Sequence, residues 1–150
     1  MKGEVKLEER FKNVVCADLL ARKKVDGKEL ILLSKRKNTG HNDGEYELPG
    51  GHLERNEDIY DAMIREAKEE LLVDIKREDI KIIHLLHHYT GERLNFIFEI
   101  DGNLIEPKIG EVEKCEELVW VDILDLPNAT TDKVKRIINN IVNNIEYDSM

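Results

Sequence analysis

The fold of this chain is predicted mainly from one stretch, residues 50–73, which reads GGHLERNEDIYDAMIREAKEELLV. It opens on Gly50-Gly51, which marks a turn where the backbone can approach a ligand closely. Asn56 is a good residue to begin a helix, and apolar side chains then recur at every fourth position. These apolar positions are Ile59, Met63, Ala67 and Leu71. The stretch therefore predicts a glycine turn followed by a helix with one buried face.

Three glutamates of this helix, Glu66, Glu69 and Glu70, are three or four residues apart, so they project from neighbouring positions. Like charges at such spacings destabilise a helix by roughly 0.2–0.5 kcal/mol per pair. Arg65 can reach Glu69, but one arginine cannot neutralise three carboxylates. Mg²⁺ and Mn²⁺ prefer oxygen ligands, so one interpretation is a cation site. The other is a solvated acidic face, which is common in a chain with 37% charged residues.

The wider spacing resembles the Nudix box, G-x5-E-x7-R-E-U-x-E-E-x-G-U, in which U is a bulky aliphatic residue. The matching positions are Gly51, Glu57, Arg65, Glu66, Glu69, Glu70 and Val73. Because the pattern fixes six polar or glycine positions at set distances, the match favours the cation site over a solvated face. Two positions depart from it: Ala67 replaces a larger aliphatic residue, and Leu72 replaces a glycine. A left-handed conformation costs leucine roughly 1–2 kcal/mol, so we expect this helix to end differently.

The resemblance to the Nudix family implies an α/β (α+β) fold, the Nudix-type α/β/α sandwich with a mixed central β-sheet. One such domain is expected over residues 1–150. The implied reaction is Mg²⁺-dependent hydrolysis of a nucleoside diphosphate linked to another group. Downstream, Glu106-Pro107, residues 113–116 and Trp120-Val121 resemble the MutT-like nucleoside triphosphate pyrophosphohydrolases. We therefore expect hydrolysis of a nucleoside triphosphate to a monophosphate and pyrophosphate.

Two alternatives to that activity stay open. One is a Nudix hydrolase that acts on ADP-ribose, a dinucleotide polyphosphate or a capped RNA. The other is a non-catalytic nucleotide-binding module, which the replacement of the box glycine by Leu72 motivates. Base and sugar preference cannot be read from the sequence, because the shape of the pocket determines them.

The resemblance also assigns roles within the box. Mg²⁺, or Mn²⁺ in its place, is expected on Glu66, Glu69 and Glu70, with the Gly51 carbonyl as a further ligand. Glu57 is expected to pair with Arg65 and steady the helix, which places both in the catalytic set with Glu69. Glu69 is also a candidate general base.

Further candidates lie outside the helix. Glu111 and Glu113, in an acidic loop at residues 103–116, are the other candidate bases. Arg36 follows a predicted strand, and a guanidinium binds phosphate bidentately; the alternative is a solvated strand end. His52 and the Gly50 backbone are candidates for substrate contact, and the alternative for His52 is an imidazole on the surface of the turn.

The rest of the chain predicts strands at residues 14–20, 30–33, 79–89, 94–100 and 117–121, with a hairpin turn at 23–28. The strand at 94–100 alternates and is expected to be half-buried. An apolar series from Val134 to Ile145 fits an amphipathic helix that begins at Asp132. We expect this helix to cover one face of the sheet and the helix of the Nudix-like box, which follows Asn56, to cover the other.

The composition of the chain limits the kinds of molecule that it is expected to bind. The net charge of −9 argues against a nucleic-acid duplex or a membrane as partner, and favours a nucleotide or nucleoside diphosphate derivative bound through cations. Cys16 and Cys115 are too few for a disulfide framework or zinc site. The charged segment Met1 to Arg10 does not resemble a signal peptide, so the cytoplasm is expected. A homodimer is compatible with the sequence, which does not determine oligomeric state.

Overall fold

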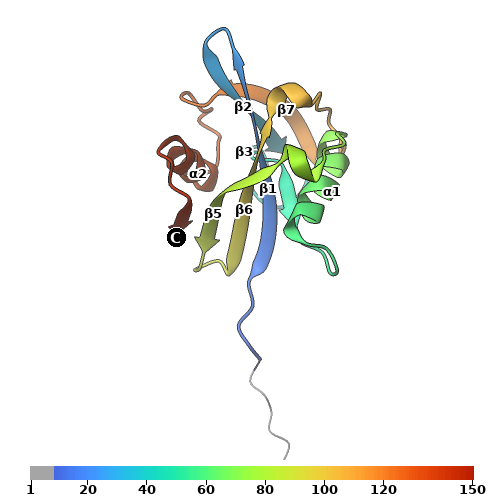
Figure 1. Cartoon of the computed structure of the whole chain (residues 1–150), viewed down its shortest axis with the longest axis vertical. Coiled ribbons are helices and arrows are strands. Elements are labelled where there is room, and N and C mark those ends of the chain that lie inside the picture. Colours follow the sequence, from blue (N-terminus) through green and yellow to red (C-terminus); the bar gives the residue numbers. More distant parts are fainter. Residues whose placement is uncertain (1–8) are drawn as a thin grey trace, which may run out of the picture.

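A mixed eight-stranded β-sheet forms the middle layer of the computed structural model, which describes residues 9–150 (Figure 1). The strands are β1 (Val14–Val25), β2 (Lys28–Arg36), β3 (Tyr46–Glu47), β4 (Gly50–His52), β5 (Lys81–His88), β6 (Arg93–Asp101), β7 (Cys115–Asp122) and β8 (Tyr147–Ser149). The helices are α1 (Ile59–Leu71) and α2 (Asp132–Val142), with short 3₁₀ turns η1 (Arg77–Asp79) and η2 (Gly102–Leu104). Most of the segment on which the cytoplasmic prediction rests, residues 1–8, lies outside the described residues.

Strand β1 lies at the centre of the sheet. It pairs in parallel with β6 and antiparallel with both β2 and β4. The turn between β1 and β2 is Asp26-Gly27, with φ of 50° and 77°, which confirms the predicted hairpin. Strand β4 pairs with residues 16–18 of β1. The Gly50-Gly51 backbone therefore lies directly against the central strand of the sheet.

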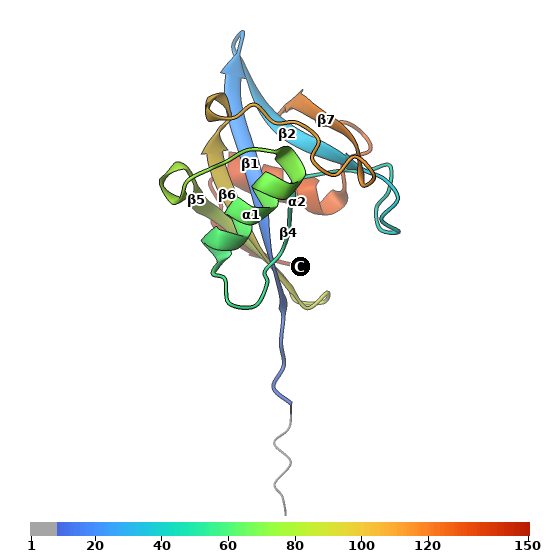
Figure 2. The same ribbon diagram turned by 90° about the vertical axis from the view of Figure 1, so that its right-hand side faces the viewer.

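Each face of the sheet is covered by one helix, as predicted (Figure 2). The α1 side chains Met63, Ala67 and Leu71 pack on one face, and Val134 and Ile137 of α2 pack on the other. Both faces of β6 are therefore covered, and the prediction of a half-buried strand there is wrong. Part 9–150 of the chain has no helix long and apolar enough to cross a membrane.

The helix ends differ from the sequence prediction. The N-cap of α1 is Asp58, whose carboxylate accepts from the Asp61 N–H at 2.8 Å while Asp61 returns a bond to the Asp58 N–H. Asn56, predicted to begin the helix, has φ of +68° and lies in the preceding turn. Helix α2 ends at Val142, before the predicted Ile145.

Leu72 ends α1 in the left-handed conformation, with φ of 54° and ψ of 38°. The prediction that this helix would end differently from the family pattern is therefore wrong. The N–H groups of Leu72 and Val73 bond to the carbonyls of Lys68 and Ala67 at 3.2 and 3.5 Å, as in a glycine-capped helix. Val73 is buried just beyond. Capping bonds and burial of the following residue offset the conformational cost of leucine.

We predict that Leu72→Gly stabilises the protein by about 1 kcal/mol, because glycine adopts this conformation without a Cβ clash. The Leu72 side chain is 58% exposed, so little packing is lost. Thermal unfolding should show a rise in Tm of roughly 2–4 °C. The matched control is Lys68→Gly, an exposed position inside the same helix, where glycine should lower Tm. A lower Tm for Leu72→Gly would contradict the prediction.

Candidate active site

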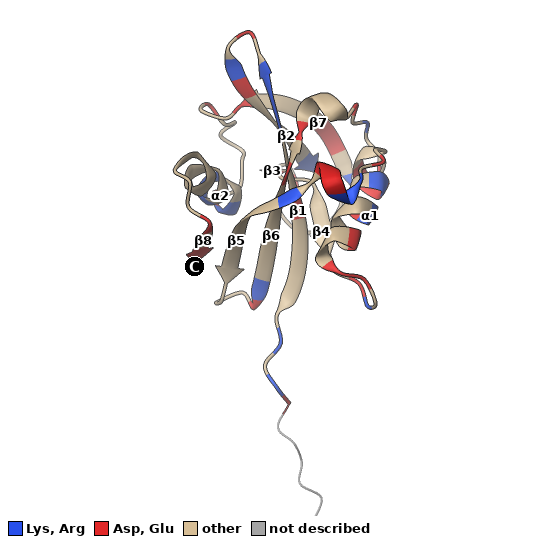
Figure 3. Cartoon of the chain, in the orientation of Figure 1, with Lys and Arg blue, Asp and Glu red and all other residues tan. Residues whose placement is uncertain are grey.

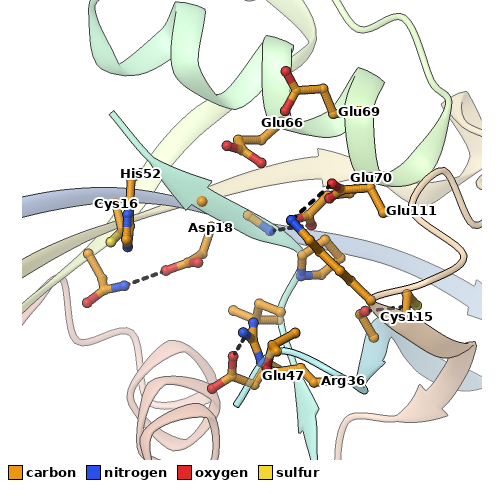
Figure 4. A pocket seen from close by; sticks show the side chains of 18 of the residues that line it. Cys16, Asp18, Arg36, Glu47, His52, Glu66, Glu69, Glu70, Glu111 and Cys115 are labelled. Carbon is orange, nitrogen blue, oxygen red and sulfur yellow. Dashed lines mark hydrogen bonds and ion pairs between the residues drawn. The ribbon is translucent and has the colours of Figure 1, made fainter. Parts of the chain in front are cut away.

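A cleft of about 610 Å³ lies where α1, β4 and the ends of β1, β2 and β6 meet (Figure 4). Its lining includes most of the residues predicted from the sequence. These are Arg36, Gly50, Gly51, His52, Arg65, Glu66, Glu69, Glu70 and Glu111. Figure 3 shows acidic and basic residues mixed along α1. The cleft lining also includes basic residues, among them Arg65, Arg93 and Lys133, so the site is not uniformly acidic.

The two glycines of β4 allow the sheet and α1 to approach closely. A Cβ added at Gly50 would lie 2.1 Å from the Ala17 carbonyl oxygen of β1. A Cβ added at Gly51 would lie 2.4 Å from the carboxylate of Glu66. The Glu66 carboxylate therefore occupies the space that any other side chain at position 51 would fill.

Arg65 holds the acidic face of α1 in place. Its guanidinium donates to the Glu57 carboxylate at 2.7 and 3.1 Å and to the His52 carbonyl at 2.9 Å. It also donates to Glu66 at 2.8 Å and to Glu69 at 3.4 Å. These bonds lower the pKa of Glu57 and raise that of Arg65. Arg65 thus joins the turn before the helix to the carboxylates on it, which is the pairing with Glu57 expected from the sequence.

Glu70 is the box carboxylate whose negative charge is least compensated by cations or hydrogen-bond donors. Its side chain accepts one hydrogen bond, from the Gly50 N–H at 3.0 Å. Burial, reinforced by the nearby charge of Glu66, raises its pKa to about 8. Burial also raises the pKa of Glu66, although the ion pair with Arg65 opposes this. Two partly desolvated acids thus face the same part of the cleft.

The loop after η2 brings Glu111 into the cleft. The N–H groups of Lys108 and Gly110 donate to the carbonyls of Leu71 and Glu70, both at 2.9 Å, so the loop caps the end of α1. This fixes the loop against the helix and places Glu111 on the lining. Glu113, the other candidate base of this loop, is exposed and does not line the cleft.

Arg36 and His52 lie on different sides of the cleft (Figure 4). Arg36 bonds to the His41 carbonyl at 2.8 Å and lies 3.5 Å from the Glu47 carboxylate, so its charge is shared with a neighbour. His52 lies at the end of β4, and burial lowers its pKa. Both side chains line the cleft and can be reached by a bound substrate.

Sequence reasoning missed Asp18 and Asn95, which also line the cleft. They come from β1 and β6, and Asn95 donates to the Asp18 carboxylate at 2.7 Å. Burial raises the pKa of Asp18. The one available signal was a polar residue at each of two positions inside otherwise apolar strands, but only the pairing of β1 with β6 brings them together.

The donor set suits a hard divalent cation. Glu66, Glu69 and Glu70 offer carboxylate oxygens and Gly51 offers a carbonyl. Glu70 makes no ion pair within residues 9–150, and its burial raises its pKa. Among residues 9–150, no trio of His, Cys, Asp and Glu side chains converges closely enough to hold an ion as it stands. Arg65 is hydrogen-bonded to both Glu66 and Glu69. For these two carboxylates to bind an ion, they would have to leave Arg65.

Comparisons with known proteins match this architecture. The NUDIX domain family matches residues 10–140. A MutT NUDIX hydrolase from Burkholderia pseudomallei gives a TM-score of 0.71 at 26% identity, covering 87% of this chain and 98% of that one. A MutT/nudix family protein from Enterococcus faecalis gives a TM-score of 0.71 at 22% sequence identity, covering 93% of this chain and 66% of that one. The third comes from Francisella tularensis, a bifunctional NMN adenylyltransferase/ADP ribose pyrophosphatase complexed with AMP and a manganese ion. This structure gives a TM-score of 0.66 at 21% sequence identity, covering 91% of this chain and 43% of that one.

The family match covers strands β1 to β7 of the sheet, α1 and most of α2, and five of the seven matching box positions line one cleft. These are Gly51, Arg65, Glu66, Glu69 and Glu70. The predicted mixed sheet between two helices is also the fold of the matching structures. This chain is therefore a member of the NUDIX domain family of hydrolases.

Proposed function

We propose that this protein is an Mg²⁺-dependent pyrophosphohydrolase that converts a nucleoside triphosphate and water to a nucleoside monophosphate and pyrophosphate. The observation that carries the proposal is the placement of Glu66 and Glu70 against the Gly50-Gly51 backbone, inside a cleft of about 610 Å³. A cleft of this size accommodates a nucleotide. Two desolvated carboxylates facing it repel a polyphosphate unless a cation lies between them.

Each side chain of the box has a distinct role in this proposal. Glu66, Glu69 and Glu70 hold Mg²⁺, or Mn²⁺ in its place, with the Gly51 carbonyl. When bound, such a cation supplies charge screening for the phosphates and makes water more acidic. Arg65, fixed by Glu57, orients the carboxylates and takes no part in bond making. Arg36 and His52 contact the phosphates from the two sides of the cleft.

Glu69 and Glu111 are the candidates to accept the proton of the attacking water. Both line the cleft, and Glu69 is half exposed, so each can reach a water near the phosphates. The Lys114 ammonium lies 3.8 Å from the Glu111 carboxylate. Glu113 is a weaker candidate because its side chain is outside the cleft lining. Phosphoryl transfer needs mainly positioning and charge stabilisation, which this arrangement supplies.

The second candidate function is hydrolysis of ADP-ribose. It is motivated by the similarity to the Francisella tularensis protein, whose description names ADP ribose pyrophosphatase. Dinucleotide polyphosphates and capped RNA share the same diphosphate linkage and belong in the same test. The non-catalytic alternative loses its motivation, because Leu72 adopts the helix end that glycine would provide.

Product analysis tests the proposal. The purified chain is incubated with Mg²⁺ and, separately, with each nucleoside triphosphate, ADP-ribose, a dinucleotide tetraphosphate and a capped RNA. Chromatography should show a nucleoside monophosphate and pyrophosphate in equal amounts from at least one triphosphate, and none when EDTA is present. Release of inorganic phosphate with a nucleoside diphosphate would contradict the proposal. Turnover of ADP-ribose alone would establish the second candidate instead.

A further inference from the structure

A polar pair interrupts the apolar face of the central sheet at one side of the cleft. Leu20 and Ile97 belong to the apolar cluster beneath α2. Two residues back along each strand, on the same face, lie Asp18 and Asn95. Burying a carboxylate and a carboxamide at the centre of a sheet destabilises the fold unless both are fully hydrogen-bonded.

The pair is not fully hydrogen-bonded. Asn95 is 1% exposed, and its Oδ1 has no hydrogen-bond partner among the described residues. Its Nδ2 donates to Asp18 Oδ2 at 2.7 Å, which fixes the orientation of the carboxylate. The second oxygen, Asp18 Oδ1, faces the Gly50 backbone and accepts no hydrogen bond from any residue in 9–150. A buried polar group without a partner calls for an explanation, and Asn95 Oδ1 is such a group in the lining of the cleft.

The position and charge of Asp18 decide which part of a nucleotide can lie there. Figure 4 shows Asp18 beside Cys16 and His52, on the side of the cleft away from Glu111 and Cys115. Burial raises the pKa of Asp18, and the charges of Lys133 and Arg93, which also line the cleft, oppose this. The ionised carboxylate repels phosphate, so the triphosphate belongs on the α1 side, where the proposed function places a cation. What remains is the nucleoside, whose base edge carries N–H donors that a carboxylate accepts.

Among the common bases, guanine best matches a carboxylate. Its N1–H and N2–H₂ groups are adjacent donors, which two carboxylate oxygens can accept side by side. Adenine and cytosine offer one amino group beside an acceptor, and uracil offers one N–H between two acceptors. An acceptor facing Asp18 would meet a second acceptor.

We propose that Asp18, oriented by Asn95, binds the base edge of the substrate and makes guanine the preferred base. The inference rests on the proposed function, because it assumes that the cleft binds a nucleotide. Asp18 touches the base, and Asn95 is a positioning residue that acts through Asp18. Burial of Asn95 fixes the side chain that holds the Asp18 carboxylate in one orientation at the cleft.

The test measures binding of GMP, AMP, CMP, UMP and 2′-deoxy-GMP to the full chain by calorimetry in Mg²⁺. Wild type should bind GMP at least about 10-fold more tightly than the other three bases. In Asp18→Asn, the new amide keeps an oxygen toward Asn95 and turns an amino group toward the base. GMP affinity should fall by about 10- to 100-fold, while AMP affinity changes less than about threefold. Asn95→Ala should lower the ratio of GMP to AMP affinity without abolishing binding.

The matched control is Asp125→Asn, the same chemical change at an exposed position outside the cleft, which should leave all five affinities unchanged. If Asp18→Asn does not fold, as judged by circular dichroism, Asp18→Ser serves in its place. Equal binding of the four bases by wild type would overturn the inference while leaving the proposed function intact. So would a loss of affinity for 2′-deoxy-GMP as large as that caused by Asp18→Asn, because Asp18 would then bind the ribose. Failure to bind any nucleotide would overturn the proposed function as well.

Discussion

Glu70→Gln is expected to lower kcat/KM by about 100-fold or more. Glutamine can still accept the hydrogen bond from the Gly50 N–H, so the fold around the helix is kept. What is lost is one negative charge at the box carboxylate whose pKa burial raises to about 8, and with it the occupancy and geometry of the bound cation. Steady-state assays at an Mg²⁺ concentration that saturates wild type measure the change. Glu78→Gln, an exposed acid outside the cleft, is the control and should retain full activity.

Activity in Glu70→Gln equal to that of wild type would contradict the assigned role of Glu70 and point to a contaminating hydrolase. Raising Mg²⁺ separates two explanations of a partial loss. If high Mg²⁺ restores the rate, the carboxylate contributes mainly to cation affinity. If it does not, the charge of Glu70 matters for catalysis after the cation has bound.

The same variant should be more stable than wild type in EDTA at pH 8. Folded Glu70, with a pKa of about 8, holds its proton more tightly than the unfolded chain does. The free energy of unfolding of wild type therefore falls as pH rises from about 4.5 to about 8. A neutral glutamine removes this dependence. Because Glu70 is partly exposed, we expect a gain of about 2 kcal/mol at pH 8 and little difference at pH 4.5, measured by thermal unfolding.

Gly50→Ala is expected to lower the stability of the fold, whereas Gly51→Ala is expected to lower activity. At Gly50, an added Cβ meets the backbone of β1, which cannot move aside without separating β4 from the sheet. We expect a loss of about 3 kcal/mol in the free energy of unfolding, which corresponds to a fall in Tm of roughly 6–12 °C. At Gly51, the added Cβ meets only the end of the Glu66 side chain, which can rotate away.

Gly51→Ala should therefore keep a Tm within a few degrees of wild type and lose activity by about 10- to 100-fold, because Glu66 is displaced. Thermal unfolding and steady-state kinetics on both variants check the contrast, and each variant serves as the control for the other. A stable, fully active Gly51→Ala protein would show that the position of the Glu66 carboxylate against the backbone has no role in the reaction.

The helical part of the site could be predicted because its information is local. Residues 57–70 place Arg65 and the three glutamates on one side of a single helix, and the 3.6-residue period alone fixes that arrangement. The β1–β2 hairpin was equally local, since Asp26-Gly27 suits the turn conformation directly. The layered fold followed from two amphipathic helices that each need an apolar face to cover.

Helix ends were harder to predict, because several residues can compete for the same position. Asp58 and Asn56 are both good N-caps, and the reciprocal bond from Asp61 decided between them. At the other end, the intrinsic cost of leucine in the left-handed conformation argued against the observed cap. The capping bonds and the burial of Val73 outweighed that cost, and neither is visible in the propensity of Leu72 itself.

The sequence by itself determined which residues of the box share a helix face, and therefore the family and the expected chemistry. Only the tertiary structure decided that burial raises the pKa of Glu70 to about 8, that Glu111 enters the cleft while Glu113 does not, and that Asp18 meets Asn95. The physical reason is that burial and long-range contacts depend on how strands and loops far apart in the chain pack together. Asp18 and Asn95 lie 77 positions apart, and the parallel pairing of β1 with β6 brings them within hydrogen-bond distance.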